Sequence, residues 1–176
     1  MKKDSRFFII KILIDFDNKN KKLQVIRNDY FLKYNLDLNT KSRILAFTND
    51  IIRLKGRLDF LIGIISNREI KFINYNILSI FRLSFYEILY CDNIPEYATV
   101  NSAVNLTKIF LSKKASGFTN FILRKLIKYK SSDNNFLNKY KTHYKWNSFP
   151  IWIQKKWEKE YGKENFIRLV NFFNKK

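Results

Sequence analysis

The sequence predicts an all-α protein, and two observations carry that prediction. Only 4 glycines and 2 prolines occur among its 176 residues, too few turn-forming residues for a fold built from many short strands. Apolar residues also recur at spacings of three and four, which is the helical period. A chain of this length suffices for one compact domain with a sizeable core and a short appendage. We therefore expect one helical domain, without a second full domain.

The first helix is expected to begin near Ser5 and to contain the apolar stretch of residues 7–14. Lys11 and Asp15 interrupt this stretch, so its apolar runs are far shorter than the roughly 18 residues that cross a bilayer. No small-residue cleavage site follows. We interpret it as a core helix capped by Ser5, and we expect no membrane association.

Two longer helices are expected in the middle of the chain. After a second helix over residues 23–36, one helix is predicted over 40–65, with Thr40 as its cap and Asp59 as an exposed acid. Residues 74–90 form the most apolar segment and are expected at the centre of the core. Arg82 within this segment could contact RNA or a partner protein, but pairing with a carboxylate such as Glu87 or Glu96 is favoured.

Two further helices are expected after the turn at Pro95. In residues 96–111, Asn101, Asn105 and Lys108 share one polar stripe. Residues 113–117 are predicted to form a basic loop that leads into a helix with an inward apolar face and outward charges. The inward residues are expected to be Phe118, Phe121, Ile122 and Leu126, and Tyr129 is available to stack on an unpaired base.

These central segments resemble the NusB/RsmB family of helical RNA-binding proteins. The resemblance rests on Arg82-Leu83-x-x-Tyr86-Glu87, then Ile94-Pro95, then Ala98-x-Val100-Asn101, and finally Gly117-Phe118-x-Asn120. It implies a NusB-like helical bundle with a short C-terminal helical extension. The family motif residues, for which we expect mainly structural roles, are Arg82, Tyr86, Glu87, Pro95, Asn101, Gly117, Phe118 and Asn120.

The composition changes after residue 130, which suggests three parts: a helical domain over 1–130, a polar linker over 131–147 and a helical extension over 148–176. In the extension, Ser148 is a candidate cap and Gly162 is expected to separate two helices. The Phe149-Pro150-Ile151-Trp152 segment resembles the one that leads into the catalytic domain of RsmB-type ribosomal RNA cytosine methyltransferases. No glycine-rich turn for S-adenosylmethionine is present, and Cys91 is interpreted as a semi-buried hydrophobe rather than a nucleophile. We therefore expect no cofactor and no methyl transfer by this chain alone.

The formal charge of +19 suggests a polyanionic partner, although a biased nucleotide composition of the source genome is an alternative explanation. A single cysteine and a single histidine exclude an internal disulfide and the common zinc sites, and they favour a reducing, cytoplasmic setting. The basic residues that we predict to contact RNA are Lys2, Lys3, Arg6, Lys113, Lys114, Arg124, Lys125 and Lys128.

The favoured function is non-catalytic binding of single-stranded or ribosomal RNA, in the regulation of transcription by antitermination or in ribosomal RNA maturation. The resemblance to NusB further suggests ribosomal protein S10 as a partner. Two alternatives stay open at this point. The chain could be the truncated or split N-terminal part of a ribosomal RNA methyltransferase, or it could be a protein-interaction scaffold without affinity for RNA.

Overall fold

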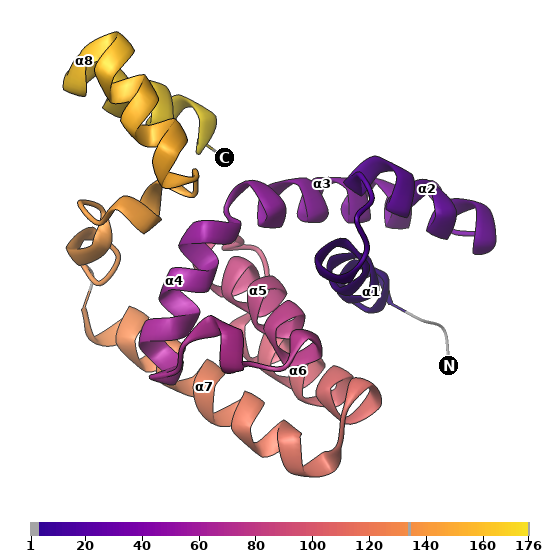
Figure 1. Cartoon of the computed structure of the whole chain (residues 1–176). Helices are drawn as coiled ribbons and strands as arrows, with labels where there is room; N and C mark the ends of the chain where they lie inside the picture. Colours follow the sequence, from indigo (N-terminus) through magenta and orange to yellow (C-terminus); the bar gives the residue numbers. More distant parts are fainter. Residues whose placement is uncertain (1–3, 134, 176) are drawn as a thin grey trace.

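The computed structural model describes residues 4–133 and 135–175, and within them the regular structure is entirely helical (Figure 1). The all-α prediction is therefore confirmed. The elements in chain order are α1 (Ser5–Asn18), α2 (Leu23–Lys33), α3 (Leu38–Arg53), α4 (Lys55–Ser66), the short 3-10 helix η1 (Ile70–Phe72), α5 (Tyr75–Tyr90), α6 (Glu96–Phe110), α7 (Lys113–Ser132), η2 (Asn138–Tyr140), η3 (Tyr144–Asn147) and α8 (Ile151–Phe173).

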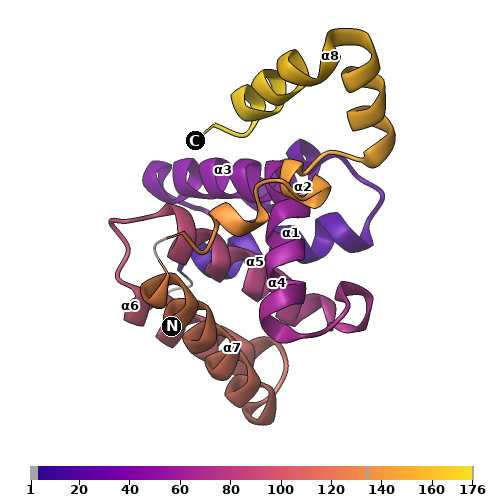
Figure 2. The ribbon, with the colours of Figure 1, turned by 90° about the vertical axis from the view of Figure 1, so that its left-hand side faces the viewer.

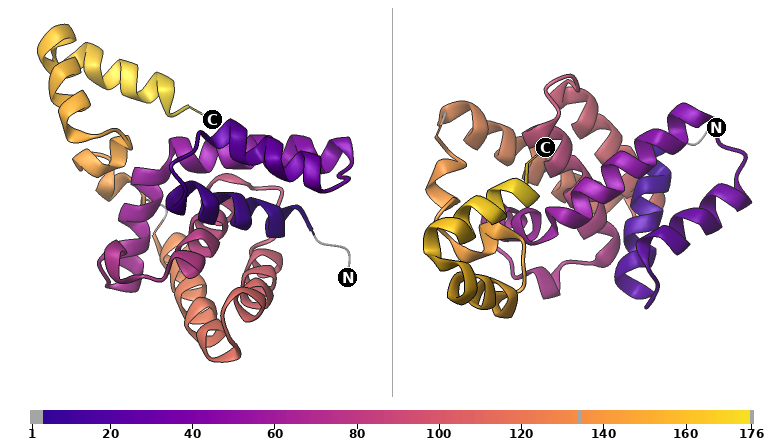
Figure 3. Two further views of the ribbon diagram at one scale, coloured as in Figure 1. Left: turned by 45° about the vertical axis from the view of Figure 1, so that its right-hand side comes forward. Right: turned by 90° about the horizontal axis from the view of Figure 1, so that it is seen from above.

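Helix α5 is the centre of the core, as its apolar sequence predicts. Every residue from Ile77 to Ile88 is buried, and α1, α3, α4, α6 and α7 all pack against it. Asn74 caps the helix, because its side-chain oxygen accepts a hydrogen bond from the Asn76 backbone N–H at 2.9 Å. Figure 3 shows α5 enclosed by the other helices of the domain.

Helix α1 is a core helix, as predicted, with Phe8, Ile9, Ile10, Ile12 and Leu13 buried. Its predicted cap is wrong, because Ser5 is the first helical residue and Asp4 takes the capping position without a side-chain capping bond. Among the described residues, no helix is long and apolar enough to cross a membrane.

The single helix predicted over residues 40–65 is wrong, because the chain breaks into α3 and α4 at Leu54. Leu54 is buried and leaves the helical conformation; α3 then packs mainly on α1, and α4 packs on α5. Asp37 caps α3 by accepting the Thr40 backbone N–H at 2.8 Å, so Thr40 is the capped residue and not the cap. Helical periodicity continues across such a break, which hides it in the sequence.

Asp59 of α4 and Arg82 of α5 meet in a buried ion-pair network. Arg82 donates to both Asp59 carboxylate oxygens, at 2.6 and 2.8 Å, and also to Asp17. Lys55 donates to the other oxygen of Asp17 at 2.6 Å. Arg82 is thus paired with carboxylates as predicted, but the expected partners Glu87 and Glu96 are wrong, and Asp59 is not a freely exposed acid. The network fastens α1, α4 and α5 together.

Two further motif residues of α5 have structural partners. The buried Glu87 accepts hydrogen bonds from Arg6 at 2.9 and 3.1 Å and from Thr99 at 2.8 Å. Its neighbour Tyr86 donates to Asp50 of α3. Burial and the Asp50 charge raise the pKa of Tyr86 far above its usual value, so it stays a hydrogen-bond donor at every physiological pH.

The C-terminal segment docks on α4 through Arg57. The Arg57 Nε donates to the Trp146 carbonyl at 2.9 Å, and its guanidinium lies 4.3 Å from the centre of the Trp146 ring. Ser148 does not cap α8 as predicted; its backbone has a positive φ of 62°, and its Oγ accepts the Arg57 backbone N–H at 3.0 Å. The backbones of α4 and Ser148 can lie this close only because residue 56 is glycine, since a Cβ on Gly56 would lie 2.9 Å from the Ser148 Cα.

Helix α8 is bent at Gly162, whose φ of 75° and ψ of 161° are not helical, so the predicted separation of two helices at this residue is confirmed. Its second half returns toward α3, as Figure 2 shows. Arg53 of α3 donates to the Phe173 and Lys175 carbonyls at 2.9 and 3.0 Å. Phe136 and Trp146 of the expected polar linker are buried against the core, while the division at 1–130, 131–147 and 148–176 stays a prediction.

Candidate nucleic-acid interface

Helices α6 and α7 form an antiparallel pair on one side of α5. Two contacts near opposite ends fix their register: Thr107 Oγ1 lies 3.0 Å from Thr119 Oγ1, and Lys130 Nζ donates to Glu96 at 3.0 Å. Within their own helices, Thr107 Oγ1 donates to the Ala103 carbonyl at 2.8 Å, and Thr119 Oγ1 lies 3.4 Å from the Ala115 carbonyl. The pair therefore presents matched lengths of helix, with the inward sides held by α5 and the outward sides free.

The outward side of α7 is a basic stripe with one aromatic residue in its middle. Spacings of four, four, three and four residues place its members on one face, and all of them are exposed: Lys113, Gly117, Phe121, Arg124 and Lys128. Lys114 is exposed beside the first of them. Phe121 was predicted to face inward, which is wrong, since its side chain is 62% exposed. Ile122 and Leu126 are buried as predicted, together with Ser116, Thr119 and Leu123.

The start of α7 also differs from the prediction. Lys113 is already helical, so residues 113–117 are the first turns of the helix and not a basic loop. Ser112 caps the helix by accepting the Ala115 backbone N–H at 3.2 Å. Gly117 therefore makes no turn; it lies within the helix and leaves bare backbone on the surface, with no atom within 4 Å of where its Cβ would be.

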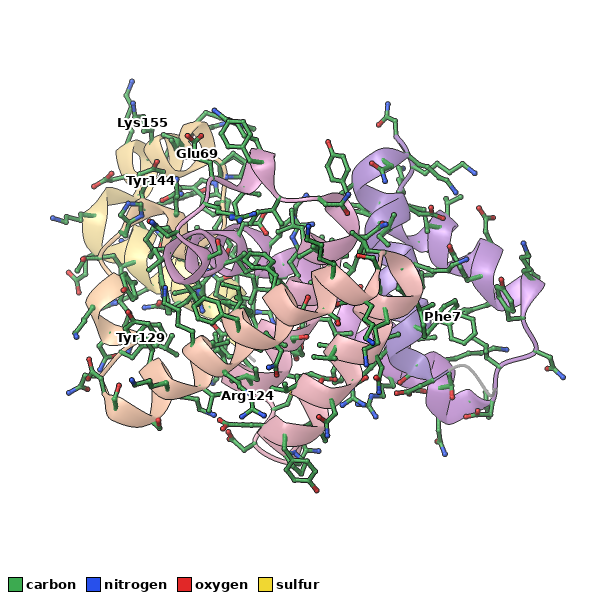
Figure 4. The ribbon with its side chains drawn as sticks, turned by 90° about the horizontal axis from the view of Figure 1, so that it is seen from below. Phe7, Glu69, Arg124, Tyr129, Tyr144 and Lys155 are labelled. Atoms are coloured by element: carbon green, nitrogen blue, oxygen red, sulfur yellow. The ribbon has the colours of Figure 1, made fainter. Side chains whose placement is uncertain are left out.

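Helix α6 adds a polar stripe beside α7. Tyr97, Asn101, Asn105 and Lys108 follow one another at helical spacings and are exposed, Tyr97 at 72%. The antiparallel register sets Asn101 level with Arg124 and Lys108 level with Gly117. Figure 4 looks onto this side of the molecule, where Arg124 lies on the α6 side of α7. We call the two stripes together, with Lys114, the α6/α7 face.

The α6/α7 face is positively charged and free of acidic residues. Residues 97–132 contain seven lysines and arginines and no aspartate or glutamate. Arg124 donates only to the neutral Asn120, at 3.2 Å. Within the described part of the chain, no ion pair engages Lys108, Lys113, Lys114 or Lys128. The charge of this face is therefore not compensated by neighbouring carboxylates.

The remaining predicted RNA contacts lie elsewhere. Arg6 is tied to the buried Glu87, so its guanidinium supports the fold and is not available to a ligand. Lys125 donates to the Ile65 carbonyl at 2.8 Å and faces α4. Lys2 and Lys3 lie outside the described residues. Tyr129, the expected stacking residue, is stacked on Phe136 with ring centres 5.7 Å apart.

Sequence reasoning missed two residues of this face, Phe121 and Tyr97. A signal for both was present, since each sits at a four-residue spacing from polar residues and not from the apolar stripe of its helix. Among the other motif residues, Pro95 occupies the capping position of α6, and Phe118 packs on Phe81 with ring centres 5.8 Å apart.

The described residues form no metal site. Cys91 is buried at the end of α5, and nowhere in residues 4–133 and 135–175 do three His, Cys, Asp or Glu side chains gather as they would around a metal ion.

The fold and this surface define an all-helical protein with one basic, acid-free face that carries exposed aromatic rings. Comparison with known proteins specifies the class further. A family model described as "NusB family" matches residues 3–128, and the chain belongs to that family. The matched residues include all of α1 to α6 and most of α7, but neither the docking segment, residues 136–147, nor α8.

Individual relatives come from both branches of the resemblance. The "Probable ribosomal RNA small subunit methyltransferase B" of Synechocystis sp. is 30% identical over 125 residues, which are 70% of this chain but only 28% of that protein. The "Transcription antitermination protein NusB" of Acetivibrio thermocellus is 28% identical over 134 residues, 74% of this chain and 92% of that protein.

A solved structure shares the fold. The chain in "Crystal Structure of a Plectonemic RNA Supercoil" superimposes with a TM-score of 0.68 at 17% identity, over 73% of this chain and 96% of that one.

Proposed function

We propose that this protein binds single-stranded RNA through the α6/α7 face and acts, without catalysis, in the cytoplasm in transcription antitermination or ribosomal RNA maturation. The observation that carries the proposal is the acid-free face with two exposed aromatic rings, on a member of the NusB family. The relatives named as antitermination and ribosomal RNA proteins support the two processes.

Each part of the face has a role in this proposal. The lysines and Arg124 neutralise phosphates along the strand, and each neutralised phosphate releases counterions. Phe121 and Tyr97 offer ring faces on which unpaired bases stack. Asn101 and Asn105 have amide groups that can hydrogen-bond base edges. A flexible single strand fits this arrangement, because its bases are free to turn toward the rings.

The proposal is tested by the salt dependence of RNA binding. In the triple variant Lys113→Ala, Arg124→Ala, Lys128→Ala, the slope of log K against log salt should fall by about 2, at about 0.7 per lost phosphate contact. A matched control, Lys33→Ala, Lys155→Ala, Lys159→Ala, removes three exposed positive charges away from the face and should leave the slope nearly unchanged. Equal losses in both variants would show that only net charge matters.

We also propose ribosomal protein S10 as a partner, which rests on the resemblance to NusB proteins. The measurement is co-elution of the purified chain with S10 in size-exclusion chromatography, followed by RNA titration of the complex. Tighter RNA binding by the complex than by the chain supports this partner. Proteins captured equally well after nuclease treatment, with no S10 among them, would favour the scaffold function instead.

A second candidate is the N-terminal part of a split ribosomal RNA methyltransferase. It is favoured by the Synechocystis relative, of which this chain matches 28%, and by the docked C-terminal helices that follow the matched domain. Sequencing the downstream reading frame decides it. A frame that encodes a cysteine-containing catalytic domain supports the split enzyme, and any other frame supports the stand-alone RNA-binding protein.

A further inference from the structure

A deep cleft separates the returning half of α8 from the helical domain. Its volume is about 1050 Å³, and its walls are formed by Arg57 of α4, the ends of α5 and α7, the docking segment of residues 136–147, and α8. We call it the α8 cleft. Figures 1 and 3 show the two bodies it lies between, the helical domain and α8. It is distinct from the α6/α7 face, which lies on the outward side of α6 and α7.

Two buried polar atoms in the walls of the cleft have no hydrogen-bond partner among the described residues: Tyr90 Oη and Asn174 Oδ1. They come from opposite walls, since Tyr90 ends α5 and Asn174 follows α8. Asn174 is only 9% exposed, and its Nδ2 is held by the Asn147 carbonyl at 2.9 Å, so its free oxygen has a fixed position. A buried polar atom left unpaired is costly, so each of these two atoms would gain from a hydrogen bond to a molecule in the cleft.

The charges of the cleft favour an anion. Lys141 and Lys163 line it, and neither forms an ion pair within residues 4–133 and 135–175. Lys130 pairs with Glu96, and Asp133 pairs with Lys139. Arg57 also lines the cleft, and its guanidinium is held by the carbonyl and the ring of Trp146. Glu158 is the acid in the walls for which the described residues provide no basic partner. The two free lysines outnumber it.

The remaining lining is apolar and aromatic. Phe136, Trp146 and Phe166 contribute to the walls and are otherwise buried. A ligand that suits the cleft therefore combines a negative group for the lysines, a planar body for the aromatic walls, and an N–H donor for Asn174 Oδ1. A nucleotide has all three, and the volume exceeds what one nucleotide needs.

We propose that the α8 cleft receives an unpaired nucleotide, with its phosphate near Lys141 and Lys163 and its base between the walls that carry Tyr90 and Asn174. This inference rests on the proposed RNA binding and adds a second site for the strand. Because the two walls belong to the helical domain and to the extension, an inserted nucleotide bridges them. RNA binding then holds α8 against the domain.

The first test is photo-crosslinking of the full chain to a thiouridine-containing single-stranded oligoribonucleotide, with mapping of the attached peptides. Crosslinks are expected both in α7 and in peptides that contain residues 136–147 or 163–174. The double variant Lys141→Ala, Lys163→Ala should lose the second set, keep the first, and lower the salt slope by about 1.4, at about 0.7 per lysine. The control is Lys155→Ala, Lys159→Ala on α8, outside the cleft, which should keep both sets.

The outcomes separate this inference from the proposed function. Crosslinks in α7 without any in the cleft overturn the inference, leave water as the occupant and support the α6/α7 face. The absence of crosslinks from both α7 and the cleft overturns both the inference and the proposed function. Equal loss of cleft crosslinks in the variant and the control also overturns the inference.

The second test identifies the source of the nucleotide by NMR, using the indole resonance of Trp146 and the side-chain amide of Asn174. Shifts induced by the oligoribonucleotide alone assign an RNA strand, and equal shifts with uridine monophosphate assign a free nucleotide; both support a nucleotide site. Equal shifts with inorganic phosphate would reduce the cleft to an anion site and overturn the nucleotide assignment.

Discussion

Replacing Arg82 with alanine tests the buried ion-pair network of the domain. Arg82 is 2% exposed and makes two hydrogen bonds to Asp59 and one to Asp17. In the variant, Asp17 keeps its ion pair with Lys55, and the partly buried Asp59 loses its ion-pair partner. Both carboxylates then lie in a region where water cannot fully solvate them.

The expected cost is about 3 to 5 kcal/mol, the usual loss when one partner of a buried ion pair is removed. This is a large share of the roughly 5 to 15 kcal/mol that stabilises a typical protein. For a chain of this size it corresponds to a fall in Tm of roughly 6 to 20 °C. Arg82→Lys should recover part of the loss, because the charge returns without the two-pronged geometry.

The measurement is thermal and urea unfolding followed by far-ultraviolet circular dichroism. The control is Arg124→Ala, which removes an exposed arginine that donates a hydrogen bond to the neutral Asn120 side chain. This variant should change the free energy of unfolding by less than about 0.5 kcal/mol. If Arg82→Ala costs no more than Arg124→Ala, the buried network does not hold α1, α4 and α5 together, and the reasoning is refuted.

Three further predictions concern the face, the docking segment and pH. Measured by fluorescence anisotropy, Phe121→Ala should weaken binding of single-stranded RNA by about 1 to 3 kcal/mol, or roughly 5- to 150-fold. The matched control Phe72→Ala removes a 70% exposed ring away from the face and should leave binding unchanged. Gly56→Ala should clash with the docked backbone at Ser148 and increase proteolysis of residues 141–150. Gly117→Ala, whose new Cβ would lie in open space, should instead raise the free energy of unfolding by up to about 1 kcal/mol. Equal proteolysis in both variants would contradict the docking of the C-terminal segment on α4. Burial opposes ionisation of Asp17, but Arg82 and Lys55 outweigh this effect and hold the pKa of Asp17 below its usual value. The difference in free energy of unfolding between the natural chain and Asp17→Asn should therefore be complete above about pH 5 and shrink as the pH falls through the folded pKa. A difference that stays constant with pH in urea titrations would refute this.

The sequence predicted features that depend on local chemistry. The continuous apolar pattern of α5, its Asn74 boundary and the interruption of α8 at Gly162 all follow from residue type and spacing, and the structure confirms them. The exposed charges of Arg124 and Lys128 were also predicted correctly, because charged side chains at helical spacings stay in solvent. The outward direction predicted for Lys125 is wrong, since its amine donates to the Ile65 carbonyl of α4.

Features that depend on distant contacts could not be predicted. The partners of Arg82 lie 23 and 65 residues away along the chain, and only the packing of α1 and α4 on α5 brings them close. Phe121 was predicted to lie on the buried face of α7, and this prediction was wrong for a similar reason. Thr119 is buried because Thr107 of α6 meets it, and this turns the more apolar Phe121 toward solvent.

The central claim, that RNA binds to the α6/α7 face, is tested most directly by an NMR titration of the full chain with a single-stranded oligoribonucleotide at two salt concentrations. We predict that backbone amide shifts concentrate in residues 97–128, with Asn101, Phe121 and Arg124 among the most perturbed, and that the affinity drops steeply between about 50 and 200 mM salt. Saturating RNA that leaves these amides unshifted, or an affinity that does not depend on salt, would contradict it.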